Sequence, residues 1–417
     1  MTETGHRRFE LVEIRLPVGL TFAGLVIGLA MGALSAESSA IELINAVADP
    51  IGSLWLRALQ MMIIPLVASL LLLGIAQMAR AARAGAAARR MMLLVFAVLA
   101  AGGAITAMIM PVLLAVFPIP DAASGFLTAV PQGAQQMPGI GDFVASLVTP
   151  NIVRAAAETA MLPLTIFFAL FALALTRLPQ EQGDRLLGLF HALGNAMLVV
   201  IGWVLWLAPI GVMALAIGVA AQAGGGAFAA LAHYILVVSV MGAFVFAAAY
   251  LVAWLVGKQN PITFACAMIP AQAVALSTQS SLASLPAMLD SASRLNLRQE
   301  TAEFVLPLAV AIFRATSPAM NLAVAIYVAH MAGIALSPAI LLAGIAVALI
   351  VSVGSVSLPG SISFVISVGP IALAMGAPIE PLALLVAVEM LPDIIRTLGN
   401  VTMNVALTSA VDRVVSD

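Results

Sequence analysis

The sequence predicts an all-α membrane protein with eight transmembrane helices and two re-entrant helical hairpins. Hydrophobic residues fill 63% of the 417 positions and charged residues only 9%, which leaves too little polar surface to cover a soluble globule. Apolar runs of roughly 18 residues or more, enough to cross about 30 Å of hydrocarbon as a helix, recur along the whole chain. Two further hydrophobic segments are interrupted by serine, glycine and proline. The chain is therefore expected to span a membrane many times.

The apolar runs define eight spans in chain order. They lie near residues 16–35, 51–78, 91–117, 155–177, 188–222, 230–256, 301–335 and 378–411. The polar N-terminal stretch leads into the first run without an evident small-residue cleavage site, so we expect an uncleaved first span. The single cysteine, Cys266, excludes an internal disulfide and a cysteine-based metal cluster.

Residues 262–290 and 336–375 form the two interrupted segments, and each contains a Ser-Leu-Pro tripeptide between two apolar arms. Proline and glycine leave backbone groups unpaired, which hydrocarbon tolerates only where those groups face protein or a water-filled cavity. Paired broken segments of this kind, arranged as inverted repeats, indicate a transporter binding site. Ordinary kinked spans are the alternative interpretation.

The distribution of basic residues predicts the orientation, because cytoplasmic loops are rich in lysine and arginine. Basic residues precede the first span and crowd the second connection, whereas residues 118–150 contain neither lysine nor arginine. This pattern predicts that both chain ends are cytoplasmic and that the 118–150 connection lies outside. The expected location is the cell (inner) membrane.

Polar side chains form one stripe along the last span. They follow one another at spacings of 4, 3, 4 and 4 residues, with Thr397 at the edge of the stripe: Glu389, Asp393, Arg396, Asn400 and Asn404. Charged groups at the centre of a bilayer cost at least about 2.5–3.5 kcal/mol each on insertion scales, so such residues favour a functional interpretation. A carboxylate and a guanidinium on one face could hold a zwitterion. A purely structural pair of Asp393 and Arg396 is the alternative.

Arg314 is the only charged residue between Glu303 and Glu380. Pro318 follows four residues later and has no N–H, so the carbonyl of Arg314 lacks its usual helical partner. The sequence therefore predicts a break in the helix beside a buried charge.

The segment "DIIRTLGNVTMN" resembles the last-helix motif D-x-x-R-T-x-x-N-V-T-G-D of the glutamate/aspartate transporter family, the dicarboxylate/amino acid:cation symporters. "STQSSLASLP" resembles the serine-rich tip of that family's first hairpin, and "AMLPLTIFFALFALAL" and "LAPIGVMALAIG" resemble its fourth and fifth spans. The resemblance implies a homotrimer that moves substrate by an elevator mechanism. It implies scaffold spans in 1–90 and in 118–227, which includes the extracellular loop, and a transport domain made of 91–117 and 228–417.

The same resemblance implies the substrate site. The aspartate of the last helix would meet the amino group of the substrate and the arginine its side-chain carboxylate, which together indicate an acidic amino acid. The matching positions are Ser280, Ser281, Ser317, Pro359, Gly360, Asp393, Arg396, Thr397 and Asn400. Gln279 and Leu282 depart from the family's first hairpin tip, so glutamate, aspartate, a related amino acid and a dicarboxylate all remain open.

The positions that hold sodium in the family have changed. Phe313 and Ala315 replace an asparagine and an aspartate, Asn404 replaces an aspartate, and Thr106 is the only side-chain oxygen of the third span. Because Na⁺ needs several oxygen ligands, the sodium sites should be degraded, and no metal or other cofactor is expected. We expect Arg314 to stand where the cation stood, as a charge that never dissociates.

Coupling to protons is a further expectation. Glu389 is a candidate proton carrier, because desolvation beside a second carboxylate favours the neutral carboxyl group. His330 is a weaker candidate, since a lone histidine late in a span is more often a packing residue. Uncoupled exchange needs neither group.

The expected function is thus secondary transport of an acidic amino acid, not coupled to sodium in the usual way. The alternatives are a proton-coupled symporter of C4-dicarboxylates or of other amino acids, and an anion channel. An enzyme is not expected, because Asp393 and Glu389 lie on one helix and give no protease dyad. The expected partners are a small-molecule substrate, membrane lipid and further copies of the chain, with no nucleic acid.

Overall fold

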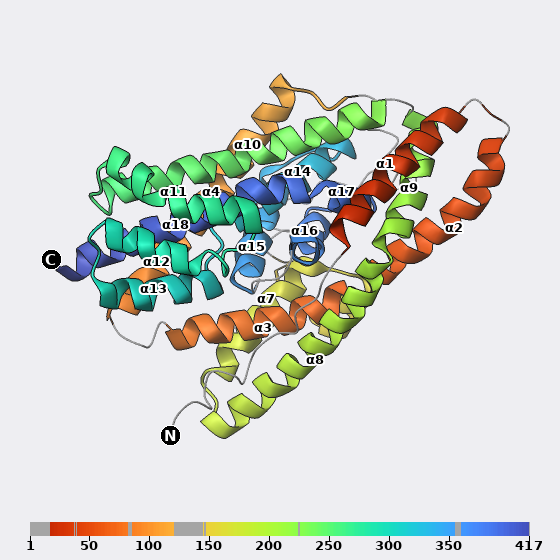
Figure 1. Cartoon of the computed structure of the whole chain (residues 1–417). Coiled ribbons are helices and arrows are strands. Elements are labelled where there is room, and N and C mark those ends of the chain that lie inside the picture. The colour runs from red at the N-terminus through yellow and green to blue at the C-terminus, as the bar shows by residue number, and fades with distance from the viewer. Residues whose placement is uncertain are drawn as a thin grey trace.

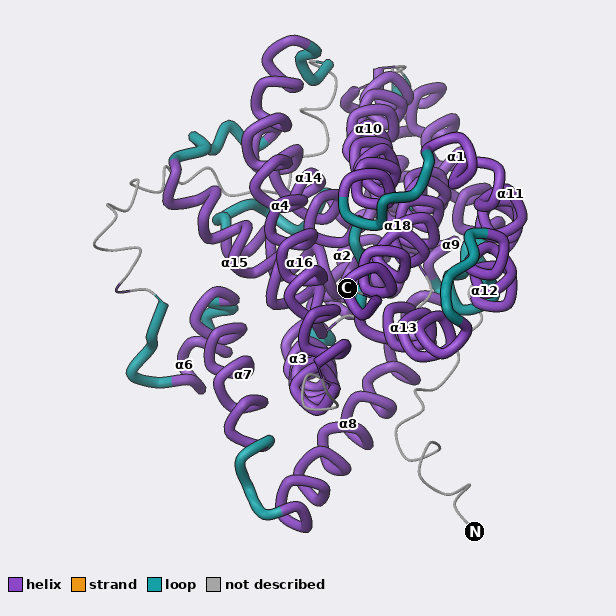
Figure 2. The backbone as a smooth tube through the Cα atoms, turned by 90° about the vertical axis from the view of Figure 1, so that its left-hand side faces the viewer, coloured by secondary structure: helices purple, strands orange, loops and turns teal. Residues whose placement is uncertain are grey.

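The computed structural model describes residues 17–36, 38, 40–81, 86–120, 145, 147–223, 226–354 and 360–416. Within these ranges the chain is almost entirely helical and contains no strand (Figure 1, Figure 2). The predicted all-α class is confirmed. In chain order the helices are α1 (Val18–Ser35), α2 (Ala40–Gln60), α3 (Ile63–Ala81), α4 (Ala86–Val116), α6 (Ile152–Ala157), α7 (Met161–Leu175), α8 (Gln180–Trp206), α9 (Ala208–Ala223), α10 (Gly226–Leu255), α11 (Pro261–Thr278), α12 (Leu285–Arg294), α13 (Gln299–Ile312), α14 (Thr316–Met331), α15 (Pro338–Gly354), α16 (Gly360–Ala374), α17 (Leu382–Val388) and α18 (Met390–Ser416).

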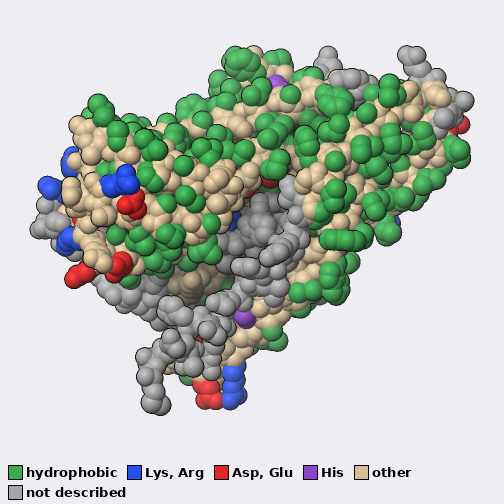
Figure 3. Space-filling view, viewed as in Figure 1, with side chains coloured by type: hydrophobic (Ala, Val, Ile, Leu, Met, Phe, Trp, Pro, Cys, Tyr) green, Lys and Arg blue, Asp and Glu red, His purple; other side chains and the backbone are tan. Residues whose placement is uncertain are grey.

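Many of these helices are apolar on most of their surface. Among the described residues, six helical stretches are long and apolar enough to cross a membrane, and several shorter apolar helices accompany them. The face shown in Figure 3 is mainly hydrophobic, and its charged side chains gather near α11, α12 and α13 and at the start of α8. Charged side chains that lie mostly near the ends of long apolar helices suit a lipid environment.

Proline marks the places where predicted spans divide into two helices. The span predicted at 51–78 covers the second half of α2 and most of α3, that at 188–222 covers most of α8 and of α9, and those around 155–177, 301–335 and 378–411 are also divided. In each case a proline occupies the second or third position of the following helix and removes one backbone hydrogen bond across the joint. These prolines are Pro65, Pro163, Pro209, Pro318 and Pro392.

Small residues bring α1 and α9 into close contact along their length, as Figure 1 shows. A Cβ atom added at Gly24, Gly28 or Gly32 would lie 2.3, 2.4 and 2.4 Å from carbonyl oxygens of α9. Spacing by four residues places the three glycines on one face of α1. They let the two backbones approach, as small residues do between helices in membranes.

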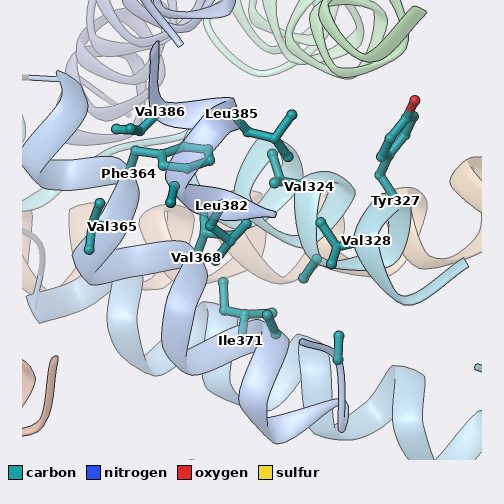
Figure 4. Packing of buried hydrophobic residues seen from close by; sticks show 14 of the residues in the cluster. Val324, Tyr327, Val328, Phe364, Val365, Val368, Ile371, Leu382, Leu385 and Val386 are labelled. Atoms are coloured by element: carbon teal, nitrogen blue, oxygen red, sulfur yellow. The ribbon is translucent and has the colours of Figure 1, made fainter. Parts of the chain in front are cut away.

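The core is built around α14, which is buried from Thr316 to Ala329. It packs against α4, α10, α15, α16 and α18. Figure 4 shows its valines facing aliphatic and aromatic side chains of α16 and α17, with Tyr327 standing at the edge of this cluster. The candidate site residues on α14 and α18 are thereby held on well-packed helices.

The two interrupted segments each form a pair of consecutive helices that pack against each other, α11 with α12 and α15 with α16. The first pair is joined by residues 279–284, with Gln279 in the left-handed conformation at φ 49°. Pro359, predicted at the second tip, lies outside the described residues, and Gly360 is the first residue of α16. The expected division into scaffold and transport domains stays a prediction.

Candidate substrate site at the α14 and α18 helices

The helix break beside Arg314 is present and faces α18. The break runs from Phe313 to Ala315, where Phe313 is extended at φ −114° and ψ 113°. The carbonyl of Arg314, which the sequence leaves without its usual partner, accepts a hydrogen bond from the backbone N–H of Ser317 at 2.9 Å. A tight turn therefore compensates for the N–H that Pro318 lacks.

Asn400 of α18 binds the first turn of α14. Its Oδ1 accepts from the backbone N–H of Thr316 at 3.0 Å and from the hydroxyl of Thr316 at 2.9 Å. Asn400 thus acts as an N-terminal cap supplied by another helix, since the first N–H groups of a helix have no internal partner. Thr397, also predicted at the site, is buried one turn earlier on α18.

Arg396 is the centre of a buried charged cluster. Its Nη2 lies 2.6 Å from Oε1 of Glu389, its Nη1 donates to Oδ1 of Asn321 at 2.7 Å, and its Nε lies 3.4 Å from Oδ1 of Asp393. Only 8% of Arg396 and 1% of Glu389 is exposed. Tyr234 of α10 donates to the second oxygen of Glu389 at 3.4 Å. Three members of the predicted stripe, Glu389, Asp393 and Arg396, therefore bind one another.

Glu389 lies at a joint and not within a continuous helix. It follows the last residue of α17 and precedes Met390, the first residue of α18. Pro392 cannot donate to the carbonyl of Val388, which ends the ladder at this point. Glu389 itself has right-handed helical angles, and its carbonyl accepts from the N–H of Asp393 at 2.9 Å, so the predicted stripe continues through the joint. The joint nevertheless leaves its carboxylate on the side of Arg396.

Hydroxyl and amide groups continue the cluster away from Arg396. The side-chain nitrogen of Asn321 donates to the hydroxyl of Ser317 at 2.9 Å, and the hydroxyls of Ser317 and Ser352 lie 3.0 Å apart. Ser352 belongs to α15, the first arm of the second helix pair. A buried polar network thus connects α18, α14 and α15.

The sequence patterns did not predict three residues of this network: Asn321, Tyr234 and Ser352. Asn321 carried a signal, because it lies four residues after Ser317 on α14 and therefore on the same face. The other two are isolated polar residues in apolar helices, and their partners come from distant parts of the chain. No spacing rule identifies such pairs.

Ser280 lies in the turn between α11 and α12, and its hydrogen bonds among the described residues are local. Its hydroxyl accepts from the N–H of Ala283 at 3.2 Å, and its carbonyl accepts from the hydroxyl of Ser284 at 2.8 Å. Ser281, next to it, is partly buried in the same turn. The structure therefore supplies no direct contact from Ser280 to the cluster around Arg396.

The four positions that correspond to the expected cation sites are all buried. Phe313 and Ala315 are buried, and neither side chain offers an oxygen. Asn404 and Thr106 are also buried, and among the described residues their side-chain polar atoms have no hydrogen-bond partner. Buried polar atoms without a protein partner are costly. Both α4 and α18, which carry them, pack against α14.

Arg314 is partly buried at the break. Its charge is attracted by Asp393 and repelled by Arg396. The described part of the chain holds no group of three or more histidine, cysteine, aspartate or glutamate side chains that could bind a metal ion.

His330 is exposed at the end of α14, so the expectation that it packs in the interior is wrong.

His233 forms a second polar contact near the cluster. Its Nδ1 lies 3.1 Å from the hydroxyl of Tyr327, and its Nε2 lies 3.1 Å from the carbonyl oxygen of Phe117. The rings of Tyr327 and Tyr234 meet edge to face at 5.4 Å. Polar and aromatic contacts therefore connect the carbonyl of Phe117, which follows α4, to the tyrosine that binds Glu389.

Comparison with known proteins finds one transporter family that matches almost the whole chain, and several similar transporters. The sequence model of the sodium:dicarboxylate symporter family matches residues 18–414. The proton/sodium-glutamate symport protein of Bacillus subtilis (strain 168) is 26% identical over 404 residues, which cover 94% of this chain and 91% of that protein. The proton/glutamate-aspartate symporter of Escherichia coli (strain K12) is 28% identical over 369 residues, 85% of this chain and 82% of that protein. The neutral amino acid transporter B(0) of Oryctolagus cuniculus is 27% identical over 432 residues, 94% of this chain and 78% of that protein.

Proposed function

Because the chain belongs to the sodium:dicarboxylate symporter family, we propose that it is a secondary active transporter of an acidic amino acid such as aspartate or glutamate. As a member of this family it is a transporter and not an enzyme, and its apolar helices make it an integral membrane protein. The observation that carries the proposed substrate is the buried cluster of Asp393 and Arg396 beside the break in α14.

The cluster suits a zwitterion with an additional carboxylate. Asp393 accepts from the ammonium group, and Arg396 binds the side-chain carboxylate. Ser317, Thr397 and Asn400 line the same region of α14 and α18. The tips carrying Ser280, Ser281, Pro359 and Gly360 supply donors to the second carboxylate, as broken-helix ends do in other transporters.

The proposed transport is independent of sodium in the usual sense. The side chains of Phe313 and Ala315 offer no oxygen to a cation, and Arg314 brings a permanent positive charge to the same break. Arg314 then stabilises the nearby carboxylates in every state of the transport cycle. Asn404 and Thr106 remain as neutral buried groups.

Proteoliposomes test this proposal directly. Purified protein is reconstituted with L-aspartate inside, and uptake of labelled L-aspartate is measured with choline, potassium or sodium outside. Saturable counterflow in choline supports the carrier, and a steep requirement for sodium contradicts the role given to Arg314. Arg314→Met is expected to abolish uptake in choline. Absence of counterflow with every acidic amino acid excludes the proposed substrate class, and a current without counterflow indicates an anion channel.

The architecture proposed for transport is a homotrimer with an elevator motion in the cell (inner) membrane, with both chain ends in the cytoplasm. The mass of the protein in lipid nanodiscs tests the trimer. Labelling of cysteines introduced at each end, in a Cys266→Ser background, tests the orientation, since Cys266 is the single native cysteine.

A second candidate is proton-coupled transport of a C4-dicarboxylate or of another amino acid. The neutral amino acid transporter among the relatives and the pairing of Arg396 with Glu389 support this candidate. A thermal-shift screen against acidic amino acids, neutral amino acids and dicarboxylates separates the two, because a ligand that binds only the folded protein raises its apparent stability.

A further inference from the structure

Asn321 fixes the direction of the hydrogen bonds that lead away from Arg396. A guanidinium only donates, so the atom of Asn321 that lies 2.7 Å from Nη1 of Arg396 must be the carbonyl oxygen Oδ1. The other end of the carboxamide is then the NH₂ group, which donates to Oγ of Ser317 at 2.9 Å. The amide of Asn321 therefore joins a donor on Arg396 to an acceptor on Ser317.

The hydroxyl hydrogen of Ser317 is committed to Ser352. Oγ of Ser352 lies 2.6 Å from the carbonyl oxygen of Ala348 and 3.0 Å from Oγ of Ser317, but a hydroxyl has a single hydrogen. A carbonyl oxygen only accepts, and two oxygens this close repel each other unless a hydrogen lies between them. The hydrogen of Ser352 therefore belongs to Ala348, and Ser317 donates the bond between the two serines.

These bonds form one directed chain of buried groups. It begins at Arg396, passes through Asn321, Ser317 and Ser352, and ends at the carbonyl of Ala348. Bonds aligned in one direction strengthen one another, and reversal of a single hydroxyl would leave a buried polar group unpaired. Among the described residues, what Ser317 keeps for a further partner is therefore a lone pair and not a hydrogen.

We propose that Ser317 acts on the substrate as a fixed hydrogen-bond acceptor, and that the site therefore takes an amino acid with a side-chain carboxamide, such as L-asparagine, in preference to L-aspartate. This inference rests on the proposed function, which gives Arg396 to the end of the substrate's side chain and places Ser317 in the same region. It extends the substrate class from acidic amino acids to their amides. Ser317 is then a specificity-determining residue, and Asn321 and Ser352 are positioning residues.

Arg396 and Ser317 together present a donor beside an acceptor. Each terminal nitrogen of a guanidinium carries two N–H groups, and the partners found among the described residues do not take all of them. A carboxamide offers its C=O to such a donor and its N–H to the lone pair of Ser317. A carboxylate offers only acceptors, so one of its oxygens faces that lone pair and is repelled. Asn321 illustrates the fit, since its own carboxamide joins the same two side chains.

The charges of the site also favour a neutral side chain. Glu389 and Asp393 flank Arg396, and Arg314 at the helix break is attracted by Asp393. When all four groups are ionised, their charges cancel. A zwitterion adds no net charge to this cluster, whereas the side-chain carboxylate of aspartate adds a negative charge, and a buried charge without a partner is costly.

Ser352→Ala tests the inference in the purified protein. The substitution removes the acceptor of the Ser317 hydroxyl hydrogen, which is then free to point at a ligand. Dissociation constants of L-asparagine and L-aspartate are measured by calorimetry for the wild type and for the variant. Ser69→Ala is the matched control, because Ser69 is a buried serine of α3 that donates to the carbonyl four residues earlier, as Ser352 does.

The wild type is expected to bind L-asparagine about tenfold more tightly than L-aspartate, or roughly 1.4 kcal/mol. Ser352→Ala should gain about tenfold in affinity for L-aspartate with little change for L-asparagine, so that the preference disappears. Ser69→Ala should keep the preference of the wild type. A wild type that prefers L-aspartate, or a preference that Ser352→Ala leaves unchanged, overturns the inference and leaves the proposed function standing.

Ser317→Ala keeps the inference testable if Ser352→Ala does not fold. An acceptor role predicts that this variant loses about tenfold in affinity for L-asparagine and none for L-aspartate. Loss of affinity for L-aspartate instead indicates that Ser317 donates to a carboxylate, which overturns the inference.

The remaining outcomes separate the two proposals. If the wild type binds L-asparagine and no acidic amino acid, the inference holds and the proposed acidic substrate is wrong. If it binds neither L-asparagine nor an acidic amino acid, both proposals are wrong.

Discussion

A methyl group added at Gly399 should disturb the cap between α18 and α14. The Cβ atom of Gly399→Ala would lie 2.6 Å from Cγ2 of Thr316, and its other neighbours lie 3.7 Å away. Carbon atoms in contact are about 3.5–4.0 Å apart, so Thr316 must move by about 1 Å or rotate. Either change draws its hydroxyl and N–H away from Asn400.

The expected cost follows from three contributions. Overpacking costs about 1–3 kcal/mol, and loss of the hydroxyl bond to Asn400 costs about 1 kcal/mol more. The better helix propensity of alanine offsets about 1 kcal/mol of this loss. The variant should therefore be less stable than the wild type by about 1–3 kcal/mol, with a corresponding fall in its apparent Tm.

A second substitution makes the test specific. Thr316→Ser removes the Cγ2 methyl group and keeps the hydroxyl that binds Asn400. Thermal unfolding and aspartate binding are compared for Gly399→Ala, for Thr316→Ser and for the double variant. The double variant is expected to recover most of the stability and binding lost by Gly399→Ala. If it is no better than the single glycine variant, the cap between Thr316 and Asn400 is not what the methyl group disturbs, and the reasoning is refuted.

Three further predictions rest on the same packing and charges. Gly28→Ala should lower the apparent Tm through contact with α9, whereas Gly19→Ala, with nothing within 4 Å of its Cβ, should not; equal unfolding temperatures would contradict the close approach. Asn321→Ala should leave a buried donor of Arg396 unpaired and destabilise the protein by about 1–3 kcal/mol in chemical unfolding, and no change in stability would show that Arg396 has found another acceptor. Arg298→Gln should cost at most about 1 kcal/mol, because 45% of the Arg298 side chain is exposed, and a larger loss in the same assay would show that the pair is better shielded from solvent.

The sequence predicted the helical class because its composition and its long apolar runs depend directly on whether the chain lies in lipid or in water. It also predicted the break near Arg314, since a proline and a charge in an apolar run are local signals. The joint at Glu389 could have been predicted by the same reasoning from Pro392. It was not, because proline inside helices such as α4 and α13 leaves them unbroken, so proline alone does not decide where a helix ends.

The contacts of the site could be predicted only in part. The stripe on the last span identified Glu389, Asp393 and Arg396, because spacing on one helix determines which side chains share a face. Asn321 and Tyr234 come from other helices, and helix spacing carries no information about them. The predicted substrate roles of the stripe depend on a ligand, and the pairing of Arg396 with Glu389 is a contact that the family resemblance did not supply.

The cap on α14 also has a consequence for biosynthesis. Thr316 depends on Asn400, a residue 84 positions later in the chain. Because the N-terminal part of a polypeptide is made first, α14 enters the membrane while its acceptor has not yet been synthesised. The first turn of α14 then keeps unpaired donors, each costing several kcal/mol in hydrocarbon, until α18 arrives. A ribosome-bound chain that ends before Asn400 is therefore expected to hold the α13–α14 break open to water, and the later synthesis of α18 completes the site.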